Sequence, residues 1–300
     1  MNYFELKITK KQAGHTIYEF LEKCHLGKKR RYLLRDKLLV NHQPVNQNYL
    51  LQEGDLLQIE IADFEGIDFI PSANTPEVLY EDPFILVINK NPNIIIYPEY
   101  KTEAGTLVND VANYYKQKGI NRTIRHIHRL DRDTSGVILF AKDMITQAYL
   151  SFLLEQNKII RKYIGYVKSS KIPNEGEVDL PISGDRHING KMITNPRGQY
   201  ALTKYKTISR GEYFSIVEFK LETGRTHQIR VHMAAINSPL LGDTLYGQGS
   251  QLISRPALHS AFISFMHPYF DEEVKVYSQL PKDMAEIINE SQLAKVNNLY

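Results

Sequence analysis

The stretch that decides the fold and the chemistry of this chain is His128-Arg129-Leu130-Asp131-Arg132-Asp133-Thr134-Ser135-Gly136. It gathers charged and hydroxyl side chains around one apolar residue, and the apolar run Val137–Ala141 follows at once. Such a run predicts a buried strand. A charged cluster beside a buried strand must form its hydrogen bonds locally, because unpaired charges are costly to remove from water. Reactive carboxylates are found in such surroundings, so this stretch is the first candidate for a functional site.

The composition is typical of a globular protein. The chain has 300 residues, 42% of them hydrophobic and 24% charged, which is long enough for two domains. A net charge of +3 permits a nucleic-acid partner without requiring one. Cys24 is the only cysteine, which excludes an internal disulfide and a cysteine-based metal site. The first residues lack an apolar signal core, and no apolar run could span a bilayer. We therefore expect a cytoplasmic protein with no membrane partner.

Residues 1–62 show the pattern of a small α+β domain. Apolar spacing predicts a helix over 17–24, and alternation predicts a half-buried strand over 57–61. Residues 28–37 hold six basic residues against one acid and predict a basic helix. Such a helix can bind a phosphate backbone, although a charge run alone more often marks a solvated face. Residues 63–75, with glycine, proline and acids, are expected to form a linker.

Residues 76–300 form the second unit, which has many strands and few helices. Strands are predicted over 84–88, 94–96, 159–167 and 214–219, and helices over 107–114, 148–155 and 229–236, the last capped by Thr226. The helices are irregularly placed between the strands. This pattern favours an α+β fold with a mixed, mostly antiparallel sheet over a regular doubly wound one.

Three kinds of chemistry compete for the charged cluster. The first is a metal site built from His126, His128, Asp131 or Asp133, His227 and His232. Arg125, Arg129 and Arg132 lie between those ligands and would repel a dication. Because His227 and His232 are five residues apart, they fall on different faces of a helix and opposite faces of a strand. We therefore expect no metal site.

The other two interpretations concern the carboxylates. In the simpler of the two, the acid pairs with a neighbouring arginine, and this is our expectation for Asp133. Alternatively, one carboxylate acts as a nucleophile on a glycosidic carbon, aimed by a cationic partner. No second carboxylate lies at a spacing that suggests a hydrolytic pair, so isomerisation or transfer is favoured over glycoside hydrolysis.

The chain resembles the RluA-type pseudouridine synthases. Residues 128–136 match that family's H-R-L-D-x-x-T-S-G motif, and residues 223–232, Thr-Gly-Arg-Thr-His-Gln-Ile-Arg-Val-His, nearly copy its second signature. Further pieces follow in the family's order, among them 80–82, 87–90, 161–165, 198–205, 241–243 and 258–259. The first unit resembles the small S4-like RNA-binding domain, with Val40-Asn41 and Gly54-Asp55 in its closing pattern. Asn91, Tyr97 and Gly165 depart from the usual family residues, away from the presumed nucleophile.

The resemblance implies an isomerase that breaks the glycosidic bond of a uridine in structured RNA and rejoins the base through a ring carbon. Such an enzyme uses no metal and no cofactor. The catalytic residues would be Asp131, the basic partner Arg230 and the aromatic Tyr163. Arg129 would fill the space left by the everted base or pair with Asp131 or Asp133. The other substrate-binding candidates are His128, Arg225, Leu241 and the basic-helix residues Lys28, Lys29, Arg30 and Arg31. For Leu241 the alternative is plain core packing.

Ribosomal RNA is the first candidate substrate and transfer RNA the second. A non-catalytic RNA-binding or ribosome-assembly protein on the same fold is the alternative, although intact Asp131, Tyr163 and Arg230 speak against it. A metallohydrolase is the third hypothesis, and it predicts an activity that chelators abolish.

Overall fold

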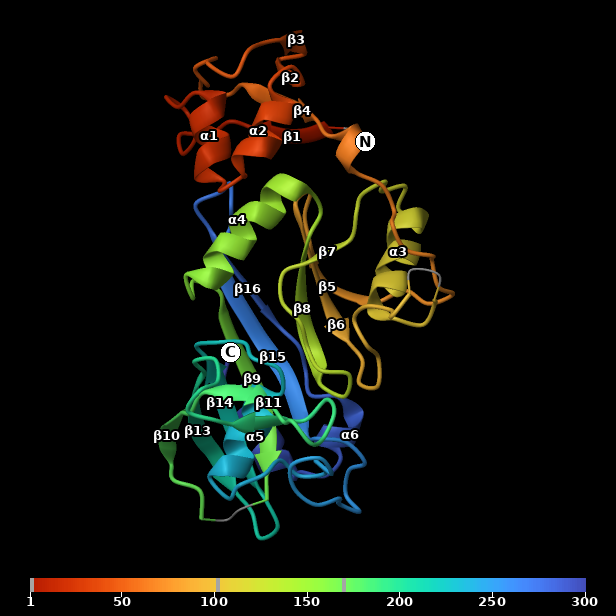
Figure 1. The fold of residues 1–300 in the computed structure, drawn as a ribbon, viewed down its shortest axis with the longest axis vertical. Helices are drawn as coiled ribbons and strands as arrows, with labels where there is room; N and C mark the ends of the chain where they lie inside the picture. Colours follow the sequence, from red (N-terminus) through yellow and green to blue (C-terminus); the bar gives the residue numbers. More distant parts are fainter. Residues whose placement is uncertain (1–2, 101–102, 169–170) are drawn as a thin grey trace.

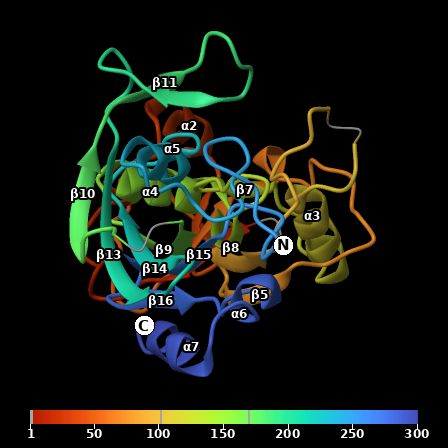
Figure 2. The same ribbon diagram turned by 90° about the horizontal axis from the view of Figure 1, so that it is seen from below.

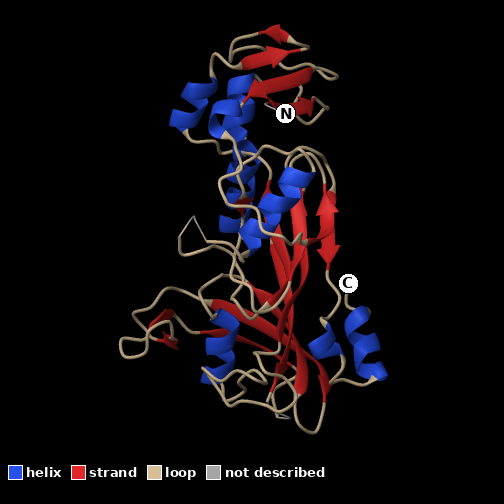
Figure 3. Ribbon diagram, turned by 90° about the vertical axis from the view of Figure 1, so that its right-hand side faces the viewer, coloured by secondary structure: helices blue, strands red, loops and turns tan. Residues whose placement is uncertain are grey.

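The computed structural model describes residues 3–100, 103–168 and 171–300. Figure 1 shows an elongated molecule, with a small N-terminal unit at one end of a long twisted sheet. Helices lie on both faces of that sheet (Figures 2 and 3). None of the helices in the described ranges has the length and apolar character needed to cross a bilayer.

The N-terminal unit is a four-stranded antiparallel sheet with the order β1-β4-β2-β3 and two short helices. Helix α1 begins where Thr16 and Glu19 form a capping box, which satisfies two backbone N–H groups at the helix start. The predicted helices and strand of this unit are confirmed. Its elements are β1 (Tyr3–Lys7), α1 (Ile17–Lys23), α2 (Lys28–Leu34), β2 (Leu38–Val40), β3 (Gln43–Pro44) and β4 (Leu56–Glu60).

The segment that follows β4 is packed against the main body. It opens with a short 3-10 helix, η1 (Ala62–Phe64). Glu65 is buried, and it accepts hydrogen bonds from Arg125 at 2.6 Å and from the backbone N–H of Thr123 at 3.0 Å. Because each of these charges would be costly to bury alone, the pair fixes the position of both side chains. The expected linker is therefore an ordered connection.

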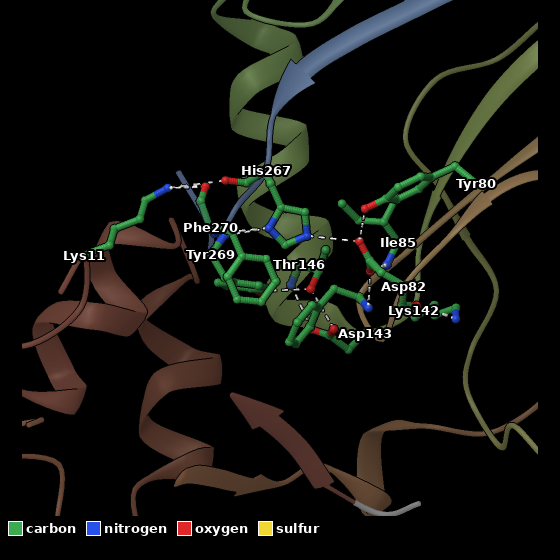
Figure 4. A network of polar contacts seen from close by, with 11 residues as sticks. Lys11, Tyr80, Asp82, Ile85, Lys142, Asp143, Thr146, His267, Tyr269 and Phe270 are labelled. Atoms are coloured by element: carbon green, nitrogen blue, oxygen red, sulfur yellow. Dashed lines mark hydrogen bonds and ion pairs between the residues drawn. The ribbon is translucent and has the colours of Figure 1, made fainter. Parts of the chain in front are cut away.

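Buried contacts also join the N-terminal unit directly to the main body. The rings of Phe4 and Tyr269 meet edge to face, with centroids 5.4 Å apart, inside one hydrophobic cluster that spans both units. The side-chain amide of Gln12 donates to the carbonyl of Tyr269 at 2.6 Å. Lys11 reaches the carbonyl of Phe270 at 3.1 Å (Figure 4). Apolar burial and hydrogen bonds both cross the interface, so the unit has a fixed orientation on the sheet.

The main body is built on a ten-stranded sheet with the order β10-β13-β14-β9-β15-β8-β6-β5, to which β16 adds through β15 and β7 through β8. Every pair of neighbours is antiparallel except β15 and β8, which run parallel. The predicted α+β fold with a mixed, mostly antiparallel sheet is confirmed. The strands are β5 (Glu77–Glu81), β6 (Ile85–Lys90), β7 (Arg125–His126), β8 (Ser135–Ala141), β9 (Ile160–Val167), β10 (Glu175–Asp179), β13 (Leu202–Arg210), β14 (Ser215–Leu221), β15 (Leu258–Met266) and β16 (Glu273–Tyr277).

Helices flank this sheet on both sides. Figure 2 shows α5 on one side of β13 and β14, with α6 and α7 on the other. A separate hairpin of β11 (Ile182–Gly184) and β12 (Met192–Thr194) projects on the α5 side. The helices are α3 (Leu107–Gln117), α4 (Met144–Glu155), α5 (Gln228–Ala235), α6 (Lys282–Ala285) and α7 (Glu290–Asn297).

The apolar run 94–96, predicted as a strand, is irregular. The carbonyls of Ile95 and Ile96 accept hydrogen bonds at 3.0 and 3.1 Å from the backbone N–H groups of Leu107 and Val108, at the start of α3. The first N–H groups of a helix have no partners inside the helix. The run therefore caps α3 instead of joining the sheet, and the strand prediction was wrong.

The start of α5 also differs from the prediction. His227, not Thr226, is the N-cap residue, and it adopts a left-handed backbone conformation with φ of 54°. The side-chain oxygen of Gln228 accepts hydrogen bonds from the N–H of Arg225 at 2.9 Å and from the hydroxyl of Thr223 at 2.7 Å. This side chain closes the loop before the helix, whose N-cap lies one residue later than the predicted cap at Thr226.

Candidate active site

A pocket of about 590 Å³ opens between the end of α4 and the start of α5. Its walls come from the loop before β8, the C-terminal end of α4, strand β9 and the segment that leads into α5. Segments far apart in the sequence therefore meet in one cavity. Among the predicted site residues, those that line it are His128, Arg129, Asp131, Tyr163, Arg225 and Arg230.

Two buried cations hold the backbone of the loop that carries Asp131. The Nζ atom of Lys90 donates to the carbonyl of Arg132 at 2.8 Å. The Nη1 atom of Arg255 donates to the carbonyl of Asp133 at 2.9 Å. These bonds hold the backbone of the two residues that follow Asp131, and the one from the Arg255 guanidinium is charge-assisted and therefore stronger than a neutral hydrogen bond.

Lys90 and Arg255 differ in ion pairing and in their electrostatic surroundings. Burial lowers the pKa of Lys90 to about 7, although the charges of Asp131 and Asp133 oppose that shift. Arg255 forms a bidentate ion pair with Asp283, at 2.7 and 2.9 Å. In the described part of the chain, no arginine lies within 4.0 Å of the Asp133 carboxylate, which we expected to be paired. Asp133 contributes to the loop through its backbone carbonyl.

Arg230 lies between two carboxylates. Its Nε and Nη2 atoms donate to Asp243 at 2.7 and 2.9 Å, and its Nη1 atom is 3.9 Å from Oδ2 of Asp131. Burial by itself would lower the pKa of Arg230, but the hydrogen bonds and charge of Asp243 outweigh it and raise that pKa. Asp243 is fully buried. The bidentate pair therefore locks the guanidinium and leaves one nitrogen directed at Asp131.

Sequence reasoning did not single out Asp243. It appeared only as the last residue of a short motif match over 241–243. The sequence did contain a signal for Asp243, because this acid stands alone between apolar and glycine-rich residues. An acid that is buried in such a segment needs a cationic partner. Asp131 is less enclosed, with its side chain 19% exposed. A partly open carboxylate beside a fixed guanidinium has the arrangement of an oriented nucleophile.

Tyr163 and His128 form the deep wall of the pocket. Tyr163 is 4% exposed, and burial raises the pKa of its phenol, which therefore stays protonated at neutral pH. Burial lowers the pKa of His128 to about 3, so its ring is neutral. The Nε2 atom of His128 accepts the backbone N–H of Leu139 at 3.3 Å, in the place of a strand carbonyl. His128 thus supports β8 as well as lining the cavity.

Of the remaining residues predicted to bind substrate, two lie at the surface of the pocket and one lies in the core. Arg129 and Arg225 are exposed at the pocket, and Nε of Arg225 donates to the carbonyl of Tyr200 at 2.9 Å. Leu241 is buried in a hydrophobic cluster with Ile164 and does not line this cavity. Since Ile164 and Tyr163 are adjacent in strand β9, their side chains point to opposite faces of the sheet. The position of Leu241 fits the core-packing alternative.

Of the histidines in the metal interpretation, His126, His128 and His227 line the pocket and His232 does not. His227 is 2.9 Å from the hydroxyl of Tyr246, whereas His232 is buried against Thr203 and the carbonyl of Leu180. Over residues 3–100, 103–168 and 171–300, no group of three or more His, Cys, Asp or Glu side chains is placed to hold a metal ion.

The basic helix α2 presents most of its cations to solvent. Lys28, Lys29 and Arg30 are exposed. Arg31 is buried, and it donates to the carbonyl of Leu26 at 3.0 Å and to Glu22 at 3.1 Å. Three of the four predicted RNA-contacting residues are therefore accessible, while Arg31 braces the helix internally.

Comparisons with known proteins identify the family of this chain. Residues 84–235 match the family model described as RNA pseudouridylate synthase, and residues 4–57 match that of the RluD ribosomal pseudouridine synthase N-terminal domain. The chain is 36% identical over 288 residues to the uncharacterized RNA pseudouridine synthase YhcT of Bacillus subtilis, covering 94% of this chain and 95% of the relative. It is 35% identical over 298 residues to ribosomal large subunit pseudouridine synthase D of Buchnera aphidicola, covering 92% and 94%.

Solved structures show the same fold. The human RNA pseudouridylate synthase domain containing 4 is similar with a TM-score of 0.59 and 22% identity, covering 74% of this chain and 93% of that one. The family match and the relatives establish that the chain belongs to the RluA-type RNA pseudouridine synthases. It is accordingly an isomerase that converts uridine to pseudouridine in RNA, as the sequence predicted.

Proposed function

We propose that this enzyme acts on uridines of the large-subunit ribosomal RNA, with Asp131 as the reacting carboxylate. The main support is the position of Asp131 in the pocket. Its Oδ2 atom is 3.9 Å from Nη1 of Arg230, and Asp243 holds that guanidinium in place. Relatives named ribosomal large subunit pseudouridine synthase D support the choice of RNA. Such a substrate fits the cytoplasmic location expected from the sequence. Transfer RNA is the competing substrate.

The pocket geometry supports a reaction on an everted nucleotide. A base stacked in a helix cannot reach a buried wall, so the target uridine must leave the stack. Asp131 then meets the anomeric carbon, and Tyr163 offers its ring to the uracil and its protonated hydroxyl for proton transfer. Arg129, exposed at the pocket, occupies the space that the base has left. His128 and Arg225 contact the nucleotide from the walls.

We assign RNA binding to the N-terminal unit, residues 1–62, joined through 63–75 to a catalytic domain over 76–300. Helix α4 supports this, because it lies next to the unit (Figure 1) and its C-terminal end lines the pocket. The ring of His25, three residues before α2, stacks on Phe152 of α4 with centroids 3.4 Å apart. The next residues of α4 line the pocket. An RNA held on α2 would therefore lie beside the active site.

Replacing Lys28, Lys29 and Arg30 together by glutamine should weaken RNA binding without changing catalysis at saturation. Three lost phosphate contacts would reduce the slope of log K against log salt concentration by roughly 2 to 3. The checks are filter binding at several salt concentrations and kcat at saturating RNA. Lys295→Gln, an exposed lysine of α7 on the other side of the sheet, is the matched control. An unchanged salt slope in the triple variant would remove α2 from the RNA interface.

The substrate assignment is tested by tritium release. Large-subunit ribosomal RNA and bulk transfer RNA from cells lacking this gene are labelled with tritium at uracil C5 and incubated with enzyme and EDTA. We expect release from the ribosomal RNA alone, and loss of one or more pseudouridines from its map when the gene is deleted. Release from transfer RNA alone would reassign the substrate. Binding without release from any cellular RNA would favour the non-catalytic alternative, and loss of activity in EDTA would favour the metallohydrolase.

A further inference from the structure

Arg161 is a buried cation in the wall of the pocket, with no ion pair among the residues that the structure describes. Its side chain is 6% exposed, and its Nε atom is buried with no hydrogen-bond partner. Five arginines are buried in the described part of the chain, and the other four each have a carboxylate within 3.1 Å. No carboxylate of the described residues lies within 4.0 Å of Arg161. Since guanidinium stays protonated, Arg161 carries a charge without a direct ion pair among the described residues.

The chain keeps this arrangement at a cost. Burying an unpaired charge is strongly unfavourable, and an apolar side chain of similar size would avoid that cost. Gly224 provides the room, since a Cβ atom at this position would come within 3.0 Å of the Arg161 Nη1 atom. The site is therefore shaped around a cation that lacks a protein anion. We conclude that its partner comes with the substrate.

The depth of Arg161 indicates which part of the nucleotide it meets. Strand β9 places Arg161 and Tyr163 two residues apart, so both side chains are on the pocket face. Both are almost fully buried, whereas Arg129 and Arg225 are exposed. A phosphodiester continues into the RNA chain on both sides, so it stays at the open side of the pocket, where Arg129 and Arg225 are exposed. The base is the part of an everted nucleotide that reaches the deep wall.

We propose that Arg161 binds a carbonyl oxygen of the uracil and stabilises the negative charge that the base acquires when its glycosidic bond breaks. This proposal rests on the proposed function. When the C1′–N1 bond breaks, its electron pair stays with uracil and spreads from N1 over the carbonyl oxygens. If Asp131 attacks C1′, an Asp131–C1′ ester bond forms as C1′–N1 breaks. Ring carbon C5 then attacks C1′ and releases the carboxylate, the C5 proton is lost, and N1 takes up a proton.

A fixed cation near developing charge lowers the barrier more than it strengthens ground-state binding. Arg161→Met removes the charge and keeps much of the volume. We expect kcat for tritium release from large-subunit ribosomal RNA to fall about 10²- to 10³-fold, with KM changed less than about threefold. Arg161→Lys keeps a charge without the planar fork, and it should recover about tenfold of the lost kcat.

Thermal unfolding separates this role from a structural one. Because Arg161 has no partner to lose, Arg161→Met should leave Tm unchanged or raise it. The matched control is Arg125→Met, which breaks the buried pair with Glu65 and should lower Tm by about 5 °C or more. A fall in Tm for Arg161→Met that matches this control, without rescue by lysine, would overturn the proposal in favour of a packing role.

A second result would also overturn it. If Arg161→Met raises KM, leaves kcat unchanged and lowers the salt slope by about one, then Arg161 contacts a phosphate. These measurements are interpreted only once the wild-type enzyme releases tritium from the same RNA. Failure of the wild type would count against the proposed substrate, whereas failure of the variants to differ from an active wild type would count against Arg161.

Discussion

Asp131→Asn is expected to lower kcat for pseudouridine formation by at least about 10⁴-fold while RNA affinity stays within about threefold of wild type. An amide of the same shape keeps the volume and one acceptor oxygen, but it is neither charged nor nucleophilic. The hydrogen bonds that hold the loop come from Lys90 and Arg255 to neighbouring carbonyls and do not involve this side chain. The folded loop should therefore survive the substitution.

Asp133→Asn is the matched control for this experiment. It changes a carboxylate two residues away in the same loop, and the contact that Arg255 makes there is to the backbone carbonyl of residue 133. We expect kcat within about fivefold of wild type. Tritium release and filter binding on the same RNA give both quantities. Equal losses in the two variants, or an active Asp131→Asn enzyme, would remove Asp131 from the role of nucleophile.

Gly136→Ala is expected to be among the most destabilising single substitutions in this protein. Gly136 has φ of 107°, a conformation that is strained for residues with a side chain. A Cβ atom there would lie 2.1 Å from the carbonyl oxygen of Ser260, in the strand that pairs with β8. The carbonyl oxygen is a backbone atom, and the position of a Cβ atom is fixed by its own backbone. Removing the clash therefore requires the parallel β8–β15 pair to separate. We expect a loss of about 4 kcal/mol or more in the free energy of unfolding.

Urea denaturation followed by circular dichroism measures this loss, and the yield of soluble protein reports the case in which the variant does not fold. Gly119→Ala is the control for strain alone, because Gly119 has φ of 66° but no atom within 4 Å of an added Cβ. Its cost should be about 1 to 2 kcal/mol. If Gly136→Ala costs no more than this control, the close approach of β8 and β15 does not limit stability.

Sequence periodicity predicted the elements that bury a continuous apolar face. The helix over 107–114 and the strands over 159–167 and 214–219 correspond to α3, β9 and β14. These segments carry their signal locally, because side chains repeat with the period of the helix or strand. The run 94–96 has strand-like composition as well, yet its backbone caps α3. The partners of its carbonyls are N–H groups at the start of α3, and the local pattern of residues 94–96 does not reveal them.

The matches over 128–136, 161–165 and 223–232 by themselves indicated the family, and through that resemblance the reaction and the candidates Asp131, Tyr163 and Arg230. Tertiary structure alone decided how they are held. Lys90, Arg255 and Asp243 lie far from Asp131 in the sequence, and the burial of Arg161 in the pocket wall without an ion pair is visible only in the folded chain. The physical reason is that burial and ion pairing depend on distances in space, which the folded sheet creates and the order of residues does not express.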